Sequence, residues 1–118
     1  MATIRITNLK LRTVIGTNDW EREYKQDVVI NIRIEFDASK ASESDDLKDT
    51  LDYKAITKNI IQAVEPSSFF LIEKLAKCIL KIVMKDPLVE EASIRIEKPL
   101  ALRFADSVSI ELSEKKKT

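Results

Sequence analysis

The chain has 118 residues, 44% of them hydrophobic and 34% charged, with one glycine and three prolines, which predicts a single compact domain over residues 1–118 without a flexible linker. Twenty basic residues balance twenty acidic ones, so nucleic acid is not expected as a partner, because binding phosphate backbones requires an excess of positive charge. There is no histidine and only one cysteine, which argues against a metal site such as catalytic zinc and against Ser-His or Cys-His nucleophiles.

The first part of the chain predicts two long strands. In residues 3–14 the apolar positions change register near Thr7 and Asn8, which indicates a β-bulge or bend. In residues 27–36 apolar and mostly polar side chains alternate, so one face of this strand is expected to be buried. The connection of residues 16–26 is too long for a tight hairpin turn and is rich in polar groups, which makes it a candidate site loop.

The middle of the chain predicts two helices. The first starts near Asp52, whose carboxylate can cap it, and carries apolar residues at helical spacing as far as Val64. The second runs over residues 69–84, with Ser67 or Ser68 as its cap.

Apolar residues cover well over half of the second helix, which is more than one sheet requires. Together with strand edges that must be paired or protected, this surplus predicts an obligate oligomer. The residues concerned are Leu71, Ile72, Leu75, Ala76, Ile79, Leu80, Ile82 and Val83.

Two further strands, over residues 92–98 and 107–112, complete the pattern. The order β-β-α-α-β-β predicts an α+β fold, an antiparallel four-stranded sheet with both helices on one face.

Lys98 occupies the last position on the apolar face of its strand, in line with Ala92, Ile94 and Ile96, before Pro99 stops the ladder. An ammonium group held against apolar surface loses hydration, and this favours its use in proton transfer. The alternative is a terminal lysine that extends its ammonium to water.

Two other residues have more than one interpretation. Glu73 can pair with Lys77 one helical turn later, or it can accept two parallel N–H donors from a planar ligand. Tyr53 lies on the apolar stripe of the first helix, so its ring belongs either to the core or to the open end of the helix.

The sequence also shows no pattern typical of a membrane or exported protein. No apolar run approaches the roughly 20 residues that span a bilayer, and the first residues lead into a strand rather than a signal peptide. We therefore expect a cytoplasmic protein without a membrane partner.

Several short motifs together resemble one family. They are Gly16, Glu21 followed by Gln26, Leu51-Asp52-Tyr53, Leu71-Ile72-Glu73-Lys74-Leu75-Ala76 and Arg95-Ile96-Glu97-Lys98-Pro99. The pattern resembles the dihydroneopterin aldolase family from end to end, and residues 101–109 resemble its dihydroneopterin triphosphate 2′-epimerase branch. The resemblance implies the tunnelling fold (T-fold), in which subunits join their sheets into a tetrameric β-barrel, two rings stack into a homo-octamer, and active sites lie between subunits.

The resemblance also implies roles for individual residues. Glu73 would bind the amidine-like edge of a pterin, with the backbone of Ile72 helping to position the ring. Tyr53 of a neighbouring subunit would stack on that ring. Glu21 and Lys98 would transfer protons, so the catalytic residues are expected to be Lys98, Glu21 and Tyr53.

The implied reaction requires no metal and no cofactor, because the N5=C6 imine of a dihydropterin is itself an electron sink. Cleavage of C1′–C2′ gives an enamine and an aldehyde. Epimerisation at C2′ follows if the aldehyde is retained and attacked again, whereas aldolase activity, releasing glycolaldehyde and 6-hydroxymethyl-7,8-dihydropterin, follows if it leaves. Arg103 can bind a triphosphate or be a solvated loop residue. We expect an epimerase of 7,8-dihydroneopterin triphosphate; the alternatives are the aldolase and a non-catalytic pterin-binding structural protein.

Overall fold

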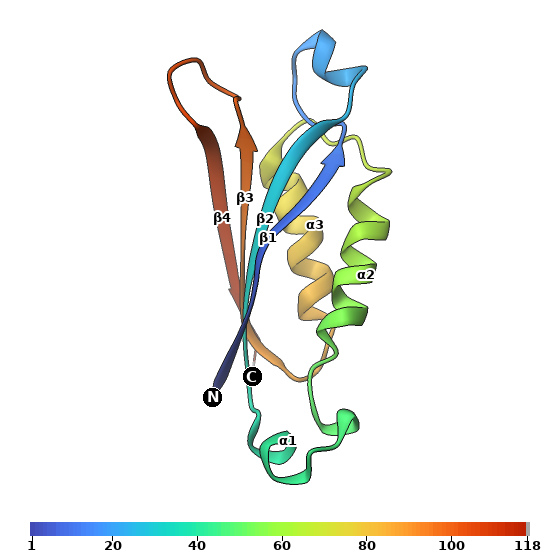
Figure 1. The fold of residues 1–118 in the computed structure, drawn as a ribbon, viewed down its shortest axis with the longest axis vertical. Coiled ribbons are helices and arrows are strands. Elements are labelled where there is room, and N and C mark those ends of the chain that lie inside the picture. Colours follow the sequence, from blue (N-terminus) through green and yellow to red (C-terminus); the bar gives the residue numbers. More distant parts are fainter. Residues whose placement is uncertain (118) are drawn as a thin grey trace.

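The computed structural model describes residues 1–117 (Figure 1). Within this range, four strands form one antiparallel sheet whose order, β1-β2-β3-β4, follows the chain. The elements are β1 (Ala2–Thr13), the 3-10 helix η1 (Asp19–Arg22), β2 (Gln26–Phe36), α1 (Ser39–Ser44), the 3-10 helix η2 (Leu47–Asp49), α2 (Tyr53–Val64), α3 (Ile72–Met84), β3 (Val89–Pro99) and β4 (Ser107–Lys115). The α+β prediction with four antiparallel strands is confirmed, and the largest boundary differences, three residues, occur at the starts of α3 and β3 and at the end of β4.

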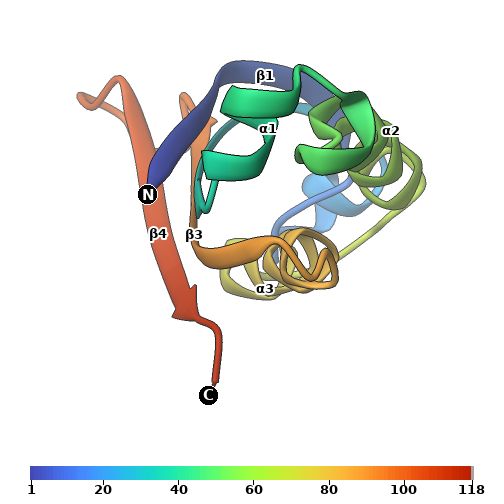
Figure 2. The ribbon, with the colours of Figure 1, turned by 90° about the horizontal axis from the view of Figure 1, so that it is seen from below.

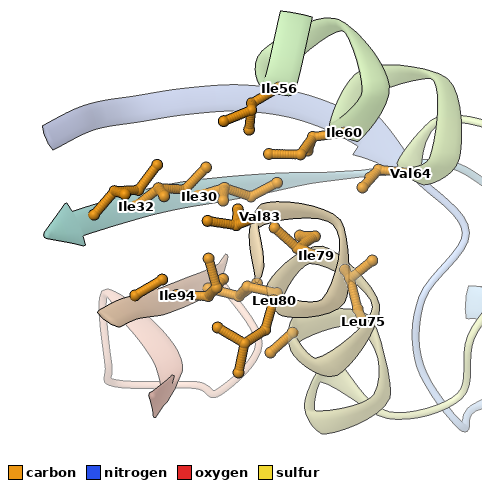
Figure 3. Packing of buried hydrophobic residues seen from close by; sticks show 14 of the residues in the cluster. Ile30, Ile32, Ile56, Ile60, Val64, Leu75, Ile79, Leu80, Val83 and Ile94 are labelled. Carbon is orange, nitrogen blue, oxygen red and sulfur yellow. The ribbon is translucent and has the colours of Figure 1, made fainter. Parts of the chain in front are cut away.

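Helices α2 and α3 lie on the same side of the sheet, as the two perpendicular views show (Figures 1 and 2). The alternation along β2 directs one set of its side chains toward these helices, where they are buried. Burying one such aliphatic side chain contributes about 1.5–3 kcal/mol, so this layer fixes the helices on the sheet. Among its members are Ile30, Ile32, Ile56, Ile60, Val64, Leu75, Ile79, Leu80, Val83 and Ile94 (Figure 3).

The predicted irregularity in the first strand is confirmed. The register between β1 and β2 shifts between Ile6 and Leu9, and Asn8 has a positive φ of 55°. The backbone N–H of Asn8 donates to Oδ1 of Asn31 at 2.9 Å, which gives the bulged residue a hydrogen-bond partner. The bulge allows both halves of β1 to keep pairing with β2.

Helix capping agrees with the sequence at one helix and not at the other. Asp52 caps α2, because its Oδ1 accepts the N–H of Ala55 at 3.0 Å. The prediction of Ser67 or Ser68 as the cap of α3 is wrong: α3 follows Leu71, which is extended and makes no side-chain cap hydrogen bond. Ser67 instead donates its hydroxyl to the Val64 carbonyl at 2.6 Å and so satisfies the end of α2.

The apolar surface of α3 is mostly used within the chain itself. Leu75, Ala76, Ile79, Leu80 and Val83 are buried in the core described above. The feature that still favours association is the sheet, because β1 and β4 each have one strand edge that pairs with nothing in residues 1–117. Among the same residues, no helix has both the length and the apolar character needed to cross a membrane.

Candidate active site

An open cleft of about 380 Å³ lies at the end of the sheet where three segments meet. These are the β1–β2 connection with η1, the start of α3, and the end of β3 with the following loop, all at the upper end of Figure 1. The cleft is lined by Ile15, Gly16, Thr17, Glu21, Phe70, Leu71, Ile72, Glu73, Lys98, Ala101, Leu102 and Val108.

Lys98 and Glu21 form an ion pair in this cleft. The strand alternation places Lys98 on the same face as the buried Ala92, Ile94 and Ile96, and its side chain is only 13% exposed. Its ammonium Nζ contacts Oε2 of Glu21, whose side chain is 6% exposed. The alternative in which Lys98 extends to water is therefore wrong, because the ammonium is turned to a buried carboxylate.

The Glu21 carboxylate has further hydrogen-bond donors. Its Oε1 accepts the backbone N–H of Asn18 at 3.2 Å, and its Oε2 accepts Nε2 of Gln26 at 3.1 Å. Gln26 also donates to the carbonyl of Ile15 at 2.8 Å, which holds its amide in place. Burial raises the pKa of Glu21, but the hydrogen bonds from Lys98, Gln26 and Asn18 outweigh it and lower the pKa from 4.5 to about 2. Glu21 is therefore ionised at neutral pH.

Gly16 allows the Glu21 carboxylate to lie this close to the backbone. Its φ is 129°, a conformation that other residues rarely adopt, and a Cβ atom there would overlap the Glu21 carboxylate. The only glycine of the sequence thus stands where both the backbone conformation and the space require it.

The start of α3 forms the facing wall of the cleft. Ile72 and Glu73 lie in its first turn, where backbone N–H groups have no partner within the helix. Among residues 1–117 Glu73 makes no ion pair, and Lys77 pairs with Oε1 of Glu114 at 3.4 Å instead. The alternative in which Glu73 pairs with Lys77 is therefore wrong, and the Glu73 carboxylate is exposed beside the cleft.

Two predicted site residues lie outside this cleft. Tyr53 is the first residue of α2, at the lower end in Figure 1, and it is half exposed, so it is not a core residue. Arg103 lies in the β3–β4 loop with its guanidinium 5.2 Å from the centre of the Phe104 ring, and it does not line the cleft, although Ala101 and Leu102 do. One chain thus brings together Glu21, Lys98, Ile72 and Glu73 but neither Tyr53 nor Arg103.

The sequence alone gave Gln26 no role, although its position five residues after Glu21 is part of the motif.

Within residues 1–117 no group of three or more His, Cys, Asp or Glu residues is placed to hold a metal ion. The polar side chains that line the cleft are those of Thr17, Glu21, Glu73 and Lys98.

Comparison with known proteins identifies the family. The sequence profile of the dihydroneopterin aldolase family matches residues 4–113. The chain belongs to this family. It is 49% identical to dihydroneopterin triphosphate 2′-epimerase of Escherichia coli K12, over 95% of this chain and 93% of the relative. The protein of that name from Pseudomonas aeruginosa is 47% identical, over 96% of this chain and 92% of the relative.

More distant members are named as aldolases. Dihydroneopterin aldolase of E. coli K12 is 31% identical, over 93% of this chain and 90% of the relative. The crystal structure of E. coli dihydroneopterin aldolase in complex with neopterin superposes with a TM-score of 0.91 at 30% identity, covering 97% of this chain and 99% of that one. Both kinds of relative are enzymes, and the family membership and the enzyme class predicted from the sequence are confirmed.

Proposed function

We propose that this enzyme epimerises 7,8-dihydroneopterin triphosphate at C2′, giving 7,8-dihydromonapterin triphosphate. The observation that carries the proposal is the buried Lys98–Glu21 pair, which opens on a cleft whose facing wall carries the exposed Glu73 carboxylate. The relatives named as epimerases are 47–49% identical to this chain, whereas the aldolase is 31% identical, and this difference favours epimerisation over cleavage as the main outcome.

Glu73 and the start of α3 are suited to bind the flat ring. A carboxylate accepts two parallel N–H donors from an amidine-like edge, and the 2-amino and N3 groups of a pterin form such an edge. The free backbone N–H groups of the first turn, at Ile72 and Glu73, supply donors to ring acceptors on the same side.

Lys98 is the proposed proton carrier. As the ammonium paired with Glu21, Lys98 donates a proton to N5, while a water beside it accepts the proton of the C2′ hydroxyl. C1′–C2′ then breaks, C2′ becomes the aldehyde carbon, and the bond electrons pass into the C6=N5 imine. The second step reverses this flow after the aldehyde has turned its other face. Because the pKa of Glu21 is held at about 2, Glu21 is a poor base at neutral pH, so it acts as the counter-ion that orients Lys98.

The proposal gives roles to Tyr53 and Arg103 as well, and the role of Tyr53 requires several copies of the chain to associate. We propose that copies of the chain join the free edges of β1 and β4 into the tetrameric barrel of the T-fold, with two rings stacked in a homo-octamer. Tyr53, the first residue of α2, does not line the cleft of its own chain, and in such an assembly a neighbouring copy can supply its ring for stacking on the pterin. Arg103 is the proposed contact for the triphosphate.

Incubation of the purified enzyme with 7,8-dihydroneopterin triphosphate and, separately, with 7,8-dihydroneopterin tests the proposal. Chromatography of the products distinguishes three outcomes. The monapterin epimer is the expected product. Mainly 6-hydroxymethyl-7,8-dihydropterin would favour the aldolase, and bound but unchanged pterin would favour a non-catalytic structural protein.

A further inference from the structure

Arg22 lies next to Glu21 in η1, and its guanidinium is inserted between the two chain segments that form the walls of the cleft. One segment is the β1–β2 connection, which carries Gly16 and Glu21. The other is the α2–α3 connection, which leads into Ile72 and Glu73. The proposed reaction depends on the separation of these two walls, because one carries the proton-transfer pair and the other the ring-binding carboxylate.

The contacts of Arg22 reach both segments at once. Its Nη1 donates to the carbonyl of Gly16 at 3.0 Å and to that of Phe69 at 3.0 Å. Its Nη2 donates to the carbonyl of Ser68, and its guanidinium carbon lies 3.9 Å from the centre of the Phe70 ring. Arg22 makes no ion pair with a carboxylate of residues 1–117. Its guanidinium instead donates to backbone carbonyls and stacks on one aromatic ring.

Before the β1–β2 connection begins, the hydroxyl of Thr13 at the end of β1 bonds the carbonyls of Val64 and Ser67, at 2.8 and 2.9 Å. Near the cleft, a single backbone hydrogen bond of the described residues joins the two segments, from the N–H of Gly16 to the carbonyl of Phe69, and at 3.3 Å it is long. Hydrogen bonds from a charged donor are about twice as strong as neutral ones. Two of the three bonds from Arg22, to the carbonyls of Phe69 and Ser68, therefore join the cleft walls, and the third holds the guanidinium on Gly16.

We propose that Arg22 is a positioning residue for the epimerisation, an inference that rests on the proposed function. By holding the two connections together, it sets the separation of Lys98 and Glu21 from Glu73, and it keeps the cleft narrow enough to retain the aldehyde between the two steps. A lysine cannot take this role, because a single ammonium lacks the planar fork that reaches several carbonyls while stacking on a ring.

The test compares Arg22→Ala and Arg22→Lys with wild type in the assembled enzyme. A displacement of about 1 Å between reacting groups can lower turnover about 100-fold, so we expect kcat to fall at least about 10-fold in both variants. We also expect the ratio of cleavage product to epimer to rise. Millimolar methylguanidinium should partly restore kcat and the product ratio in Arg22→Ala, since it can fill the same space, but it should not do so in Lys98→Met.

Arg12→Ala is the matched control. Arg12 precedes the same connection and also donates to a carbonyl, that of Lys25 at 3.0 Å, but it is exposed and pairs with Asp27 on the surface. We expect its kcat and product ratio to remain at the wild-type values.

Amide hydrogen exchange separates this inference from the proposed function. Exchange at residues 16–23 and 69–73 should be faster in Arg22→Ala than in wild type, even without substrate. Unchanged exchange would overturn the inference whatever the turnover, and faster exchange with wild-type kcat and product ratio would reduce Arg22 to a structural residue. If Arg22→Ala does not fold, the same two readouts on Arg22→Lys decide. Wild-type enzyme without any epimerisation would instead contradict the proposed function, and exchange alone would then decide whether Arg22 joins the walls.

Discussion

Acidic groups at the two ends of this molecule differ in their burial and in the number of their hydrogen-bond partners. At the cleft end, Glu21 is buried and its carboxylate is bonded by Lys98, Gln26 and Asn18. At the other end, around α1 and η2, acidic groups bind local donors at the surface: Asp46 accepts the N–H of Lys48 at 2.9 Å.

A charge taken out of water requires several partners, whereas an exposed charge that caps a turn requires only one. Burying the Glu21 carboxylate costs free energy that its hydrogen-bond partners must offset, and this burial occurs at the cleft. Tyr53, the first residue of α2, does not line the cleft, so its proposed role requires a second copy of the chain.

The strongest test of the cleft is Lys98→Met, which removes the ammonium and keeps a side chain of similar length. We expect turnover to fall at least about 100-fold, the usual loss for a missing general acid or base, while neopterin binding measured by fluorescence titration changes little. Lys77→Met is the control, because that lysine pairs with Glu114 on the surface. Wild-type turnover in Lys98→Met would remove Lys98 from the proposed mechanism.

Mixed oligomers test whether the two ends come together between copies. Tyr53→Ala and Lys98→Met should each have low turnover, but equal amounts assembled together should regain about a quarter of the wild-type activity, because random assembly unites intact residues at that fraction of sites. Co-expression with two affinity tags and a turnover assay measures this. A mixture no more active than the two separate variants would mean that Tyr53 and Lys98 of different copies do not meet in one site.

Glu73→Gln sharpens the assignment of the second wall of the cleft. Loss of a charge-assisted hydrogen bond should weaken neopterin binding roughly 10-fold or more, without a change in the urea midpoint, because Glu73 makes no ion pair in residues 1–117. Glu65→Gln, an exposed change at the end of α2, serves as the control. An unchanged dissociation constant would leave Glu73 without a role in pterin binding.

Acid unfolding compares the two ends directly. The pKa of Glu21 is lowered from 4.5 to about 2, so its ionised form stabilises the fold above pH 4.5, and this stabilisation is lost as the pH falls toward 2. The hydrogen bond from Ser44 also lowers the pKa of Asp49, but its charged partner Lys40 is 80% exposed, so solvent screens that ion pair. In urea titrations at decreasing pH, the loss of stability should be smaller in Glu21→Gln than in wild type, and Asp49→Asn should change it less. Equal effects of the two substitutions would mean that the Lys98–Glu21 pair contributes no more to the pH dependence of stability than Asp49 does.

Local rules explain which predictions about the fold succeeded. Strand alternation alone placed Lys98 on the core face, and a single aspartate before a helical pattern located the cap of α2, because both depend on residues close in sequence. The cap of α3 was predicted wrongly for a tertiary reason: Ser67 is drawn to the end of α2 and to Thr13, with 3.0 Å between the two hydroxyl oxygens. The contact with Thr13 of β1 therefore helps to hold Ser67 at the end of α2 and not at the start of α3.

By itself, the sequence determined the order and faces of the elements, the exclusion of histidine chemistry and the family resemblance, because these depend on composition and short-range periodicity. Only the tertiary structure decided how the charged groups are paired. Lys98 and Glu21 are 77 residues apart in the chain, and Arg22 reaches the carbonyls of Ser68 and Phe69 across the fold. No local pattern encodes such contacts, since each depends on where β3 and the α2–α3 connection come to rest against the β1–β2 connection.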